Sequence, residues 1–252
     1  MAILAALGIA FFVLPLLGLI ARTPWGDAAS ELVSPASLDA LRLSLVASLS
    51  ATAVALLLGV PLAWLYARVE FPGRAVLRAL TTLPMVLPPV VGGIALLLAF
   101  GRRGLLGGLL SDIGITLPFT TAGAVMAETF VAMPFLVLTV EAGLRSMDRR
   151  YEDAARTLGA GRWKVFWRVT MPLIAPSLLA GAVLCWARAL GEFGATITFA
   201  GNFPGVTQTM PLAVYLLLES DPQASFVLSL LLLAISVAVL VGLRHRWLGP
   251  QP

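Results

Sequence analysis

Six long apolar stretches constrain the fold of this chain more than any other feature of its sequence. They cover approximately residues 2–21, 41–67, 79–100, 119–143, 171–197 and 223–243. A hydrocarbon core of about 30 Å is crossed by roughly 20 residues of α-helix, so each stretch is long enough to span a membrane. Charged residues make up only 12% of the chain, against roughly 25% in soluble domains. We therefore predict an all-α, polytopic integral membrane protein with six transmembrane helices.

The distribution of basic residues predicts how these helices are oriented. Arginine-containing segments follow the second, fourth and sixth stretches, at residues 68–78, 145–168 and 244–246. By the positive-inside rule these flanks and both termini are predicted to be cytoplasmic, and the loops around 22–40, 101–118 and 198–222 external. The first stretch has neither a basic leader nor a convincing cleavage site, so we expect it to be retained as a helix. Arg102 and Arg103 are the exception on the outer face, where they could steer an anion or form only a solvated surface.

The segment 147–172 is too polar to lie in lipid and predicts two short helices. Asp148 is a plausible N-cap of the first helix, and Gly159 is its predicted stop. The second helix has three aromatic residues on one side and three basic residues on the rest: Trp163, Phe166 and Trp167, and Arg162, Lys164 and Arg168. Such a pair suits the bilayer surface or a groove on a partner protein.

The third stretch contains three prolines that cannot all be accommodated in an uninterrupted helix: Pro84, Pro88 and Pro89. Broken backbone at membrane depth is tolerated where protein or a water-filled cavity supplies hydrogen-bond partners, so one interpretation is that this segment lines a transport pathway. The alternative is a helix that starts at Pro88 or Pro89, with the preceding residues at the membrane interface.

Two later stretches contain charged residues. Glu128 lies well inside the fourth stretch, so it is protonated, paired within the bundle or close to water. Arg188 and Glu192 are four residues apart in the fifth stretch and can pair on one helix face. A structural ion pair and direct contact with a substrate are both open. Gly191 and Gly194 are predicted to let another helix approach closely.

The middle of the polar segment resembles a known motif. Asp153-Ala154-Ala155, then Gly159, then Thr170-Met171-Pro172 is similar to the cytoplasmic EAA loop of ABC importer permeases. Asp153 stands where that family usually has glutamate, with Glu152 beside it. The resemblance implies that the loop, about 145–172, contains a coupling helix that docks on an ATPase subunit through Glu152, Asp153, Ala154, Ala155, Gly159, Ala160, Gly161 and Pro172. The alternative is an ordinary basic connection between two membrane helices.

The resemblance extends from about residue 38 to residue 243, over the type I ABC importer permease fold. Three runs are similar to the oxyanion importers: Leu87-Pro88-Pro89-Val90-Val91, Gly101-Arg102-Arg103-Gly104, and 188–199. Together they are most similar to molybdate permeases, some of which also transport tungstate; sulfate permeases share the run 191–194. This divides the chain into an N-terminal helix with its external loop (1–37), a permease domain (38–243) and a cytoplasmic tail (244–252).

The family resemblance also implies an assembly and a mechanism. Two copies of the chain would form the pore as a homodimer in a bacterial or archaeal cell membrane. Two ATPase subunits would bind inside, and an extracytoplasmic binding protein would deliver the oxyanion. The candidates for the anion pathway are Pro88, Pro89, Arg102, Arg103, Glu128, Arg188, Glu192, Thr196 and Thr198.

The sequence lacks the residues that several kinds of chemistry require. There is no Gly-rich phosphate loop with Lys and Ser/Thr, so we expect no enzyme activity and no cofactor in this chain, with ATP and Mg²⁺ bound by the partner ATPase. His245 is the single histidine and Cys185 the single cysteine, so neither a His-based metal cluster nor an internal disulfide is expected. The arginines orient membrane helices and require no nucleic acid. A membrane-embedded hydrolase would need catalytic pairs that are missing, and a proton-coupled transporter with Glu128 as relay leaves the coupling loop unexplained.

Overall fold

The computed structural model describes residues 1–247, and this part of the chain is helical and contains no strand. The elements are α1 (Ala2–Arg22), α2 (Ala28–Leu32), α3 (Pro35–Arg68), α4 (Arg74–Thr82), a 3₁₀ turn (Leu83–Met85), α5 (Pro89–Phe100), α6 (Gly107–Asp112), α7 (Thr121–Ser146), α8 (Arg150–Thr157), α9 (Arg162–Val165), a π turn (Phe166–Thr170), α10 (Met171–Leu190), α11 (Gly194–Ala200), α12 (Met210–Ser220) and α13 (Pro222–Trp247). The predicted all-α class is confirmed. The last predicted segment, the tail 244–252, begins inside α13, and 248–252 lie outside the described residues.

Five helices are long and apolar enough to cross a membrane, and a sixth span is obtained if one bent pair is counted as a single span. That pair, Arg74–Met85 and Pro89–Phe100, is bent by 118°. The third apolar stretch is therefore not one continuous helix. Helix α5 starts at Pro89, which is the start that the alternative interpretation expected. Pro88 has ψ 129° because a residue that precedes proline is pushed out of the α-helical region.

Two other predicted elements differ from the structure. The fifth stretch does not continue to residue 197, because α10 ends at Leu190 and the chain turns before α11 begins at Gly194. The predicted external loop 198–222 contains the apolar helix α12. Hydropathy detects neither feature, since the turn lies in an apolar run and α12, at 11 residues, is too short to register as a span.

The chain divides into two compact units, of which the first combines 1–44 with the segment from residue 202 onward. In this unit α12 packs against α13, and α1 and α2 also contact α13. Its core contains Ala40, Met210, Ala213 and Leu228. The backbone N–H of Met210, at the start of α12, donates to Ser44 Oγ at 2.6 Å. This bond holds the beginning of α12 against α3.

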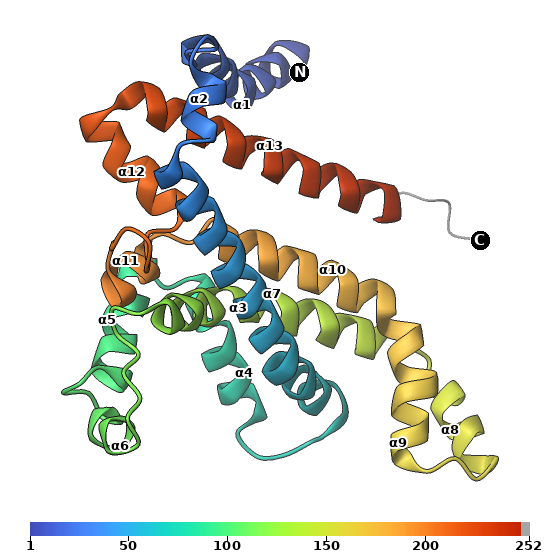
Figure 1. The fold of residues 1–252 in the computed structure, drawn as a ribbon. Helices are drawn as coiled ribbons and strands as arrows, with labels where there is room; N and C mark the ends of the chain where they lie inside the picture. The colour runs from blue at the N-terminus through green and yellow to red at the C-terminus, as the bar shows by residue number, and fades with distance from the viewer. Residues whose placement is uncertain (248–252) are drawn as a thin grey trace. The chain divides into compact units, whose positions relative to one another are not determined.

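The second unit, 45–201, contains the candidate site residues. Helices α7 and α10 lie side by side in it, with the inner part of α3 in the same core (Figure 1). Small residues make this packing close: a Cβ added to Gly143 of α7 would lie 2.5 Å from Ser177 Cβ of α10. A second cluster joins α5, α7 and α11 around the fully buried Phe199. Helices α8 and α9 form a hairpin where α7 ends and α10 begins (Figure 1).

Candidate functional site

The first half of the predicted coupling loop folds as the helix α8. The carboxylate of Asp148 accepts a hydrogen bond from the Arg150 N–H at 2.9 Å, although the N-cap position itself is Arg149. At the other end Gly159 has φ +82°, the left-handed conformation that glycine adopts without strain. The Gly159 N–H bonds to Arg156 O and the Ala160 N–H to Ala155 O, which is the Schellman pattern. Gly159 is thus confirmed as the residue that ends this helix.

The two neighbouring acids of the loop lie in opposite environments. The side chain of Glu152 is 9% exposed and forms an ion pair with Arg68, at the end of α3, at 3.4 Å. Its Oε1 also accepts a hydrogen bond from the Thr170 hydroxyl at 2.7 Å. The side chain of Asp153 is 68% exposed and pairs only with Arg156, one turn along α8. Glu152 therefore fastens the hairpin to α3, and Asp153 is free to meet a partner.

The outer surface of the hairpin is unusually apolar for a polar segment. Leu158 is 88% exposed, and three aromatic side chains are also largely exposed: Tyr151, Trp163 and Trp167. Trp163 and Trp167 each make an edge-on contact with Phe166. Of the other residues predicted to couple, Ala155 and Ala160 are half-buried, and Ala154, Gly159, Gly161 and Pro172 are exposed. Exposed apolar side chains of this kind mark an interaction surface.

Pro172 lies at the junction between the loop and the membrane helix α10. It occupies the first turn of α10, directly after the π turn Phe166–Thr170. Proline has no N–H and cannot bond to the carbonyl four residues earlier, which favours irregular hydrogen bonding just before it. The Met171 N–H bonds instead to Phe166 O, five residues back. The helix therefore passes without a break from α9 into α10.

Two glycines let α5 and α11 approach each other closely. A Cβ added to Gly194 would lie 2.8 Å from Pro89 Cβ, and one added to Gly93 would lie 2.6 Å from Thr198 Cβ. The predicted close approach at Gly194 is confirmed. No other helix of the described chain approaches Gly191, which is exposed and has only its own helix within reach of an added Cβ.

The predicted ion pair between Arg188 and Glu192 is present at 2.6 Å, although Glu192 lies beyond the end of α10. The second oxygen of Glu192 accepts a hydrogen bond from the Ala195 N–H, in the first turn of α11, at 2.8 Å. Glu192 is buried, whereas the Arg188 side chain is 29% exposed. The carboxylate thus joins the end of α10 to the start of α11.

Glu128 and Thr196 carry buried polar atoms without partners. Glu128, on α7, is 1% exposed, and neither its Oε2 nor the hydroxyl of Thr196, on α11, has a hydrogen-bond partner in the described structure. Glu128 is close enough to Glu192 to interact with it electrostatically. Buried polar atoms without partners are rare and point to a functional role or to water.

The remaining pathway candidates lie on α11 and next to the two ends of α5. The Thr198 hydroxyl donates to Gly194 O at 2.7 Å, within its own helix. Arg102 and Arg103 are exposed in the turn between α5 and α6, and Pro88 is exposed at the start of α5. Within the described part of the chain no group of three or more His, Cys, Asp or Glu side chains could hold a metal ion.

Comparison with known families shows to which family the chain belongs. Residues 55–251 match the model of the binding-protein-dependent transport system inner membrane component. The chain belongs to this family. Its members are transport subunits of the inner membrane, so this permease is a multi-pass membrane protein, as its apolar helices require.

Individual relatives of this permease cover most of its length. It is 48% identical over 244 residues to the molybdenum transport system permease protein ModB of Mycobacterium tuberculosis, covering 96% of this chain and 92% of the relative. It is 45% identical over 212 residues to the protein of that name from Escherichia coli K12, covering 84% and 93%. It is 41% identical over 204 residues to the sulfate transport system permease protein CysW of Synechococcus elongatus, covering 81% and 71%.

A solved structure shows the same fold. The permease superposes with a TM-score of 0.74 and 19% identity on a chain of a bacterial ABC transporter involved in the import of the acidic polysaccharide alginate, covering 97% of this chain and 93% of that one. The predicted type I ABC importer fold is confirmed.

One buried carboxylate of this permease was not predicted from the sequence. Glu141, on α7, is 1% exposed and forms ion pairs with Arg145 at 2.7 Å and with Arg78, on α4, at 3.0 Å. The spacing of Glu141 and Arg145, four residues on one helix, could have indicated the first pair. Nothing in the sequence indicates the second, because Arg78 lies 63 residues away on a helix that folds back at the proline turn.

Proposed function

We propose that this chain is the membrane-spanning subunit of an ATP-driven molybdate importer. The observation that carries the proposal is the 48% identity to the molybdenum transport permease of Mycobacterium tuberculosis over 96% of the chain. Two copies of the chain form the pathway, two ATPase subunits drive it, and an extracytoplasmic protein delivers the dianion. ATP and Mg²⁺ are bound by the ATPase subunits, so this chain is a transport subunit and catalyses no reaction itself.

The hairpin α8–α9 is the part of the chain that receives the ATPase in this proposal. Its exposed apolar side chains supply a docking surface, and the exposed Asp153 supplies a charge for the partner. The buried pair of Glu152 and Arg68 ties the hairpin to α3, so that a displacement of α8 moves α3 with it. Family resemblance assigned this role to the motif, and the geometry supports it by separating a buried anchor from an exposed contact.

In this proposal the dianion crosses near α5, α7 and α11. This region contains the unpartnered hydroxyl of Thr196 and the charged side chains of Glu128, Arg188 and Glu192. Glu128 and Glu192 are both buried acids, and only Glu192 has an arginine partner, Arg188, so direct contact between either carboxylate and an oxyanion is unfavourable. We therefore assign Glu192 the structural role of holding Arg188 and α11. Arg188, which is partly exposed, and the free hydroxyl of Thr196 are the groups offered to the anion. Arg102 and Arg103 attract the anion on the outer side.

Uptake of labelled molybdate tests the proposal directly. Cells that lack this chain should regain molybdate uptake when it is restored, and excess tungstate should compete more strongly than excess sulfate. The sulfate permease of Synechococcus elongatus, at 41% identity, makes sulfate the second candidate substrate. Restored sulfate uptake without restored molybdate uptake would overturn the molybdate assignment and support that candidate.

A proton-coupled transporter is a candidate of another class, favoured only by the unpartnered carboxylate of Glu128. Copurification of partner proteins with the chain distinguishes an ATP-driven importer from a proton-coupled transporter. An ATPase that copurifies, and is lost when Leu158 and Trp163 are both replaced by Ser, supports the importer. Uptake by the purified chain alone, driven by a proton gradient, would refute it.

A further inference from the structure

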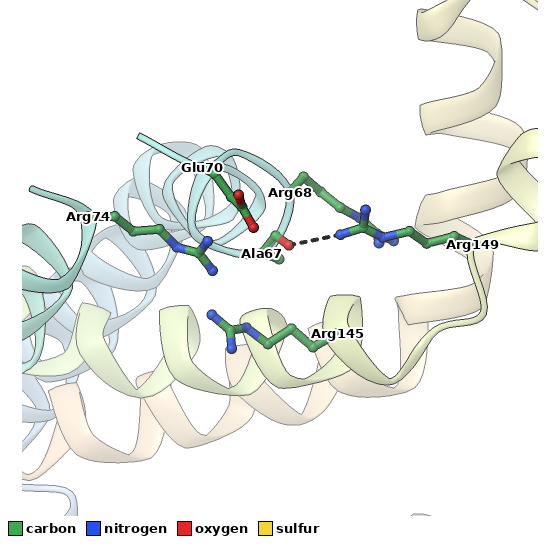
Figure 2. Close-up of a pocket in the computed structure, with 6 residues that line it drawn as sticks. All are labelled: Ala67, Arg68, Glu70, Arg74, Arg145 and Arg149. Atoms are coloured by element: carbon green, nitrogen blue, oxygen red, sulfur yellow. Dashed lines mark hydrogen bonds between the residues drawn. The ribbon is translucent and has the colours of Figure 1, made fainter. Parts of the chain in front are cut away.

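A pocket of about 440 Å³ lies in the second unit, apart from the groups assigned to the transport pathway. It is bounded by the end of α3, the turn into α4, the last turns of α7 and the residue before α8. Figure 2 shows the side chains that line it, which are Ala67, Arg68, Glu70, Arg74, Arg145 and Arg149. Four of the six carry a guanidinium group, so the pocket brings together cations from two segments, 67–74 and 145–149, that are distant in the sequence.

The acids around the pocket do not balance these arginines. Arg68 is paired with Glu152, and Arg145 shares Glu141 with Arg78. Five arginines against three glutamates, with Glu70 included, leave the cluster with a net charge of +2. Arranging like charges around an open space is unfavourable unless an anion occupies it.

Two of the arginines have no acid partner of their own. The Arg74 side chain makes neither a hydrogen bond nor an ion pair to any described residue, and it points with Arg145 into the same space (Figure 2). Arg149 donates only one long bond, of 3.5 Å, to Ala67 O. Most of the N–H donors of these two planar groups are therefore available to a ligand.

We propose that this pocket binds a tetrahedral oxyanion with two negative charges, either a free ion or the phosphomonoester headgroup of a lipid. Planar guanidinium groups match the oxygen geometry of such anions and bind them through paired hydrogen bonds. A dianion also equals the net charge of the cluster. The volume exceeds that of one such ion, which leaves room for bound water or for the rest of a headgroup.

The position of the pocket connects its ligand to the coupling hairpin. Arg149 is the residue directly before α8, and Arg68 holds Glu152 of α8. An anion that joins Arg149 to Arg74 fixes the start of α8 against the turn that leads into α4. This site goes beyond the transport reaction, and it does not depend on which oxyanion is imported.

The proposal is tested by measuring how tightly two anions bind the full-length chain in phosphatidylcholine nanodiscs. The anions are inorganic phosphate, at mildly alkaline pH, and sodium molybdate. Arg74→Gln should weaken binding roughly tenfold, because it removes one charge-assisted pair of hydrogen bonds. Glu70→Gln should strengthen binding by about threefold, because it removes the acid that lines the pocket. Arg150→Gln is the matched control: it removes a neighbouring exposed charge that does not line the pocket, and binding should not change. Effects of opposite sign at Glu70 and Arg74 are not expected from a structural role.

A second arm distinguishes the source of the anion. If a lipid headgroup is the ligand, free anions fail to bind in phosphatidylcholine, but phosphatidic acid copurifies with the parent chain and with Glu70→Gln and is lost from Arg74→Gln. Two results would overturn the proposal. One is that neither the free anions nor phosphatidic acid bind the parent better than Arg74→Gln, and the other is that Arg150→Gln weakens binding as much as Arg74→Gln.

Discussion

Replacing one partner of the buried pair of Glu152 and Arg68 tests quantitatively how the hairpin α8–α9 is held against α3. Removing one partner of a buried ion pair costs about 3–5 kcal/mol. The N–O separation of 3.4 Å is long, so we expect the lower end of this range for Glu152→Ala, about 3 kcal/mol. This variant also leaves the Thr170 hydroxyl without its acceptor. Because the contact joins only the hairpin to α3, the loss should appear as local opening of α8.

Amide hydrogen exchange of the chain in detergent measures this opening. A change of about 3 kcal/mol corresponds to roughly a hundredfold faster exchange in α8. Glu152→Gln keeps an acceptor for Thr170 and should show about half of the effect in free energy. Asp153→Ala is the matched control, since an exposed pair contributes about 0.5 kcal/mol or less. If α8 exchanged equally fast in the Asp153 and Glu152 variants, the assignment of Glu152 as the anchor would be wrong.

Three further predictions concern single positions. Gly159→Val should lose molybdate uptake while the chain is still inserted, because a β-branched residue at φ +82° is strained by about 1–3 kcal/mol. Gly159→Asn tolerates this conformation and should retain uptake. Equal uptake by both variants would contradict the role of the turn. Gly194→Ala places a Cβ 2.8 Å from Pro89 Cβ and should lower stability by about 1–3 kcal/mol in a thermal melt, with Gly8→Ala, in open space, as a control that does not destabilise. Glu128→Gln breaks no ion pair and should melt no lower than the parent, and a clear loss of stability would show that the carboxylate has a partner.

Much of the membrane architecture could be predicted because it depends on local properties of the sequence. Lengths of apolar sequence located α1, α7 and α13, and the proline chemistry at Pro88 and Pro89 located a break. The end of α10 could not be predicted in this way. No proline marks it, and the chain turns at Gly191 while the apolar run continues. What stabilises the turn is the two-sided bonding of Glu192, which exists only in the folded chain.

The candidate site shows the same division between local and distant information. The polar segment 147–172 predicted two short helices, and Gly159 predicted the end of the first. The sequence could not show which acid is the anchor, because Glu152 and Asp153 are adjacent and chemically similar. The difference between them comes from Arg68, which lies 84 residues away in sequence. Pairing over such a distance depends on tertiary packing.

The buried carboxylates of the second unit indicate a route by which a displacement of the hairpin α8–α9 reaches α7, which carries Glu128. Four carboxylates are buried there, and three of them have an arginine partner: Glu141, Glu152 and Glu192. The pair of Glu152 and Arg68 connects α8 to α3, and α3 shares a core of small side chains with α7, which carries Glu128. A close-packed core of this kind transmits displacement because it cannot be compressed. On the proposed mechanism, coupling through α3 needs both the buried anchor and the small residues at the α3–α7 contact, so loosening either one alone should weaken it.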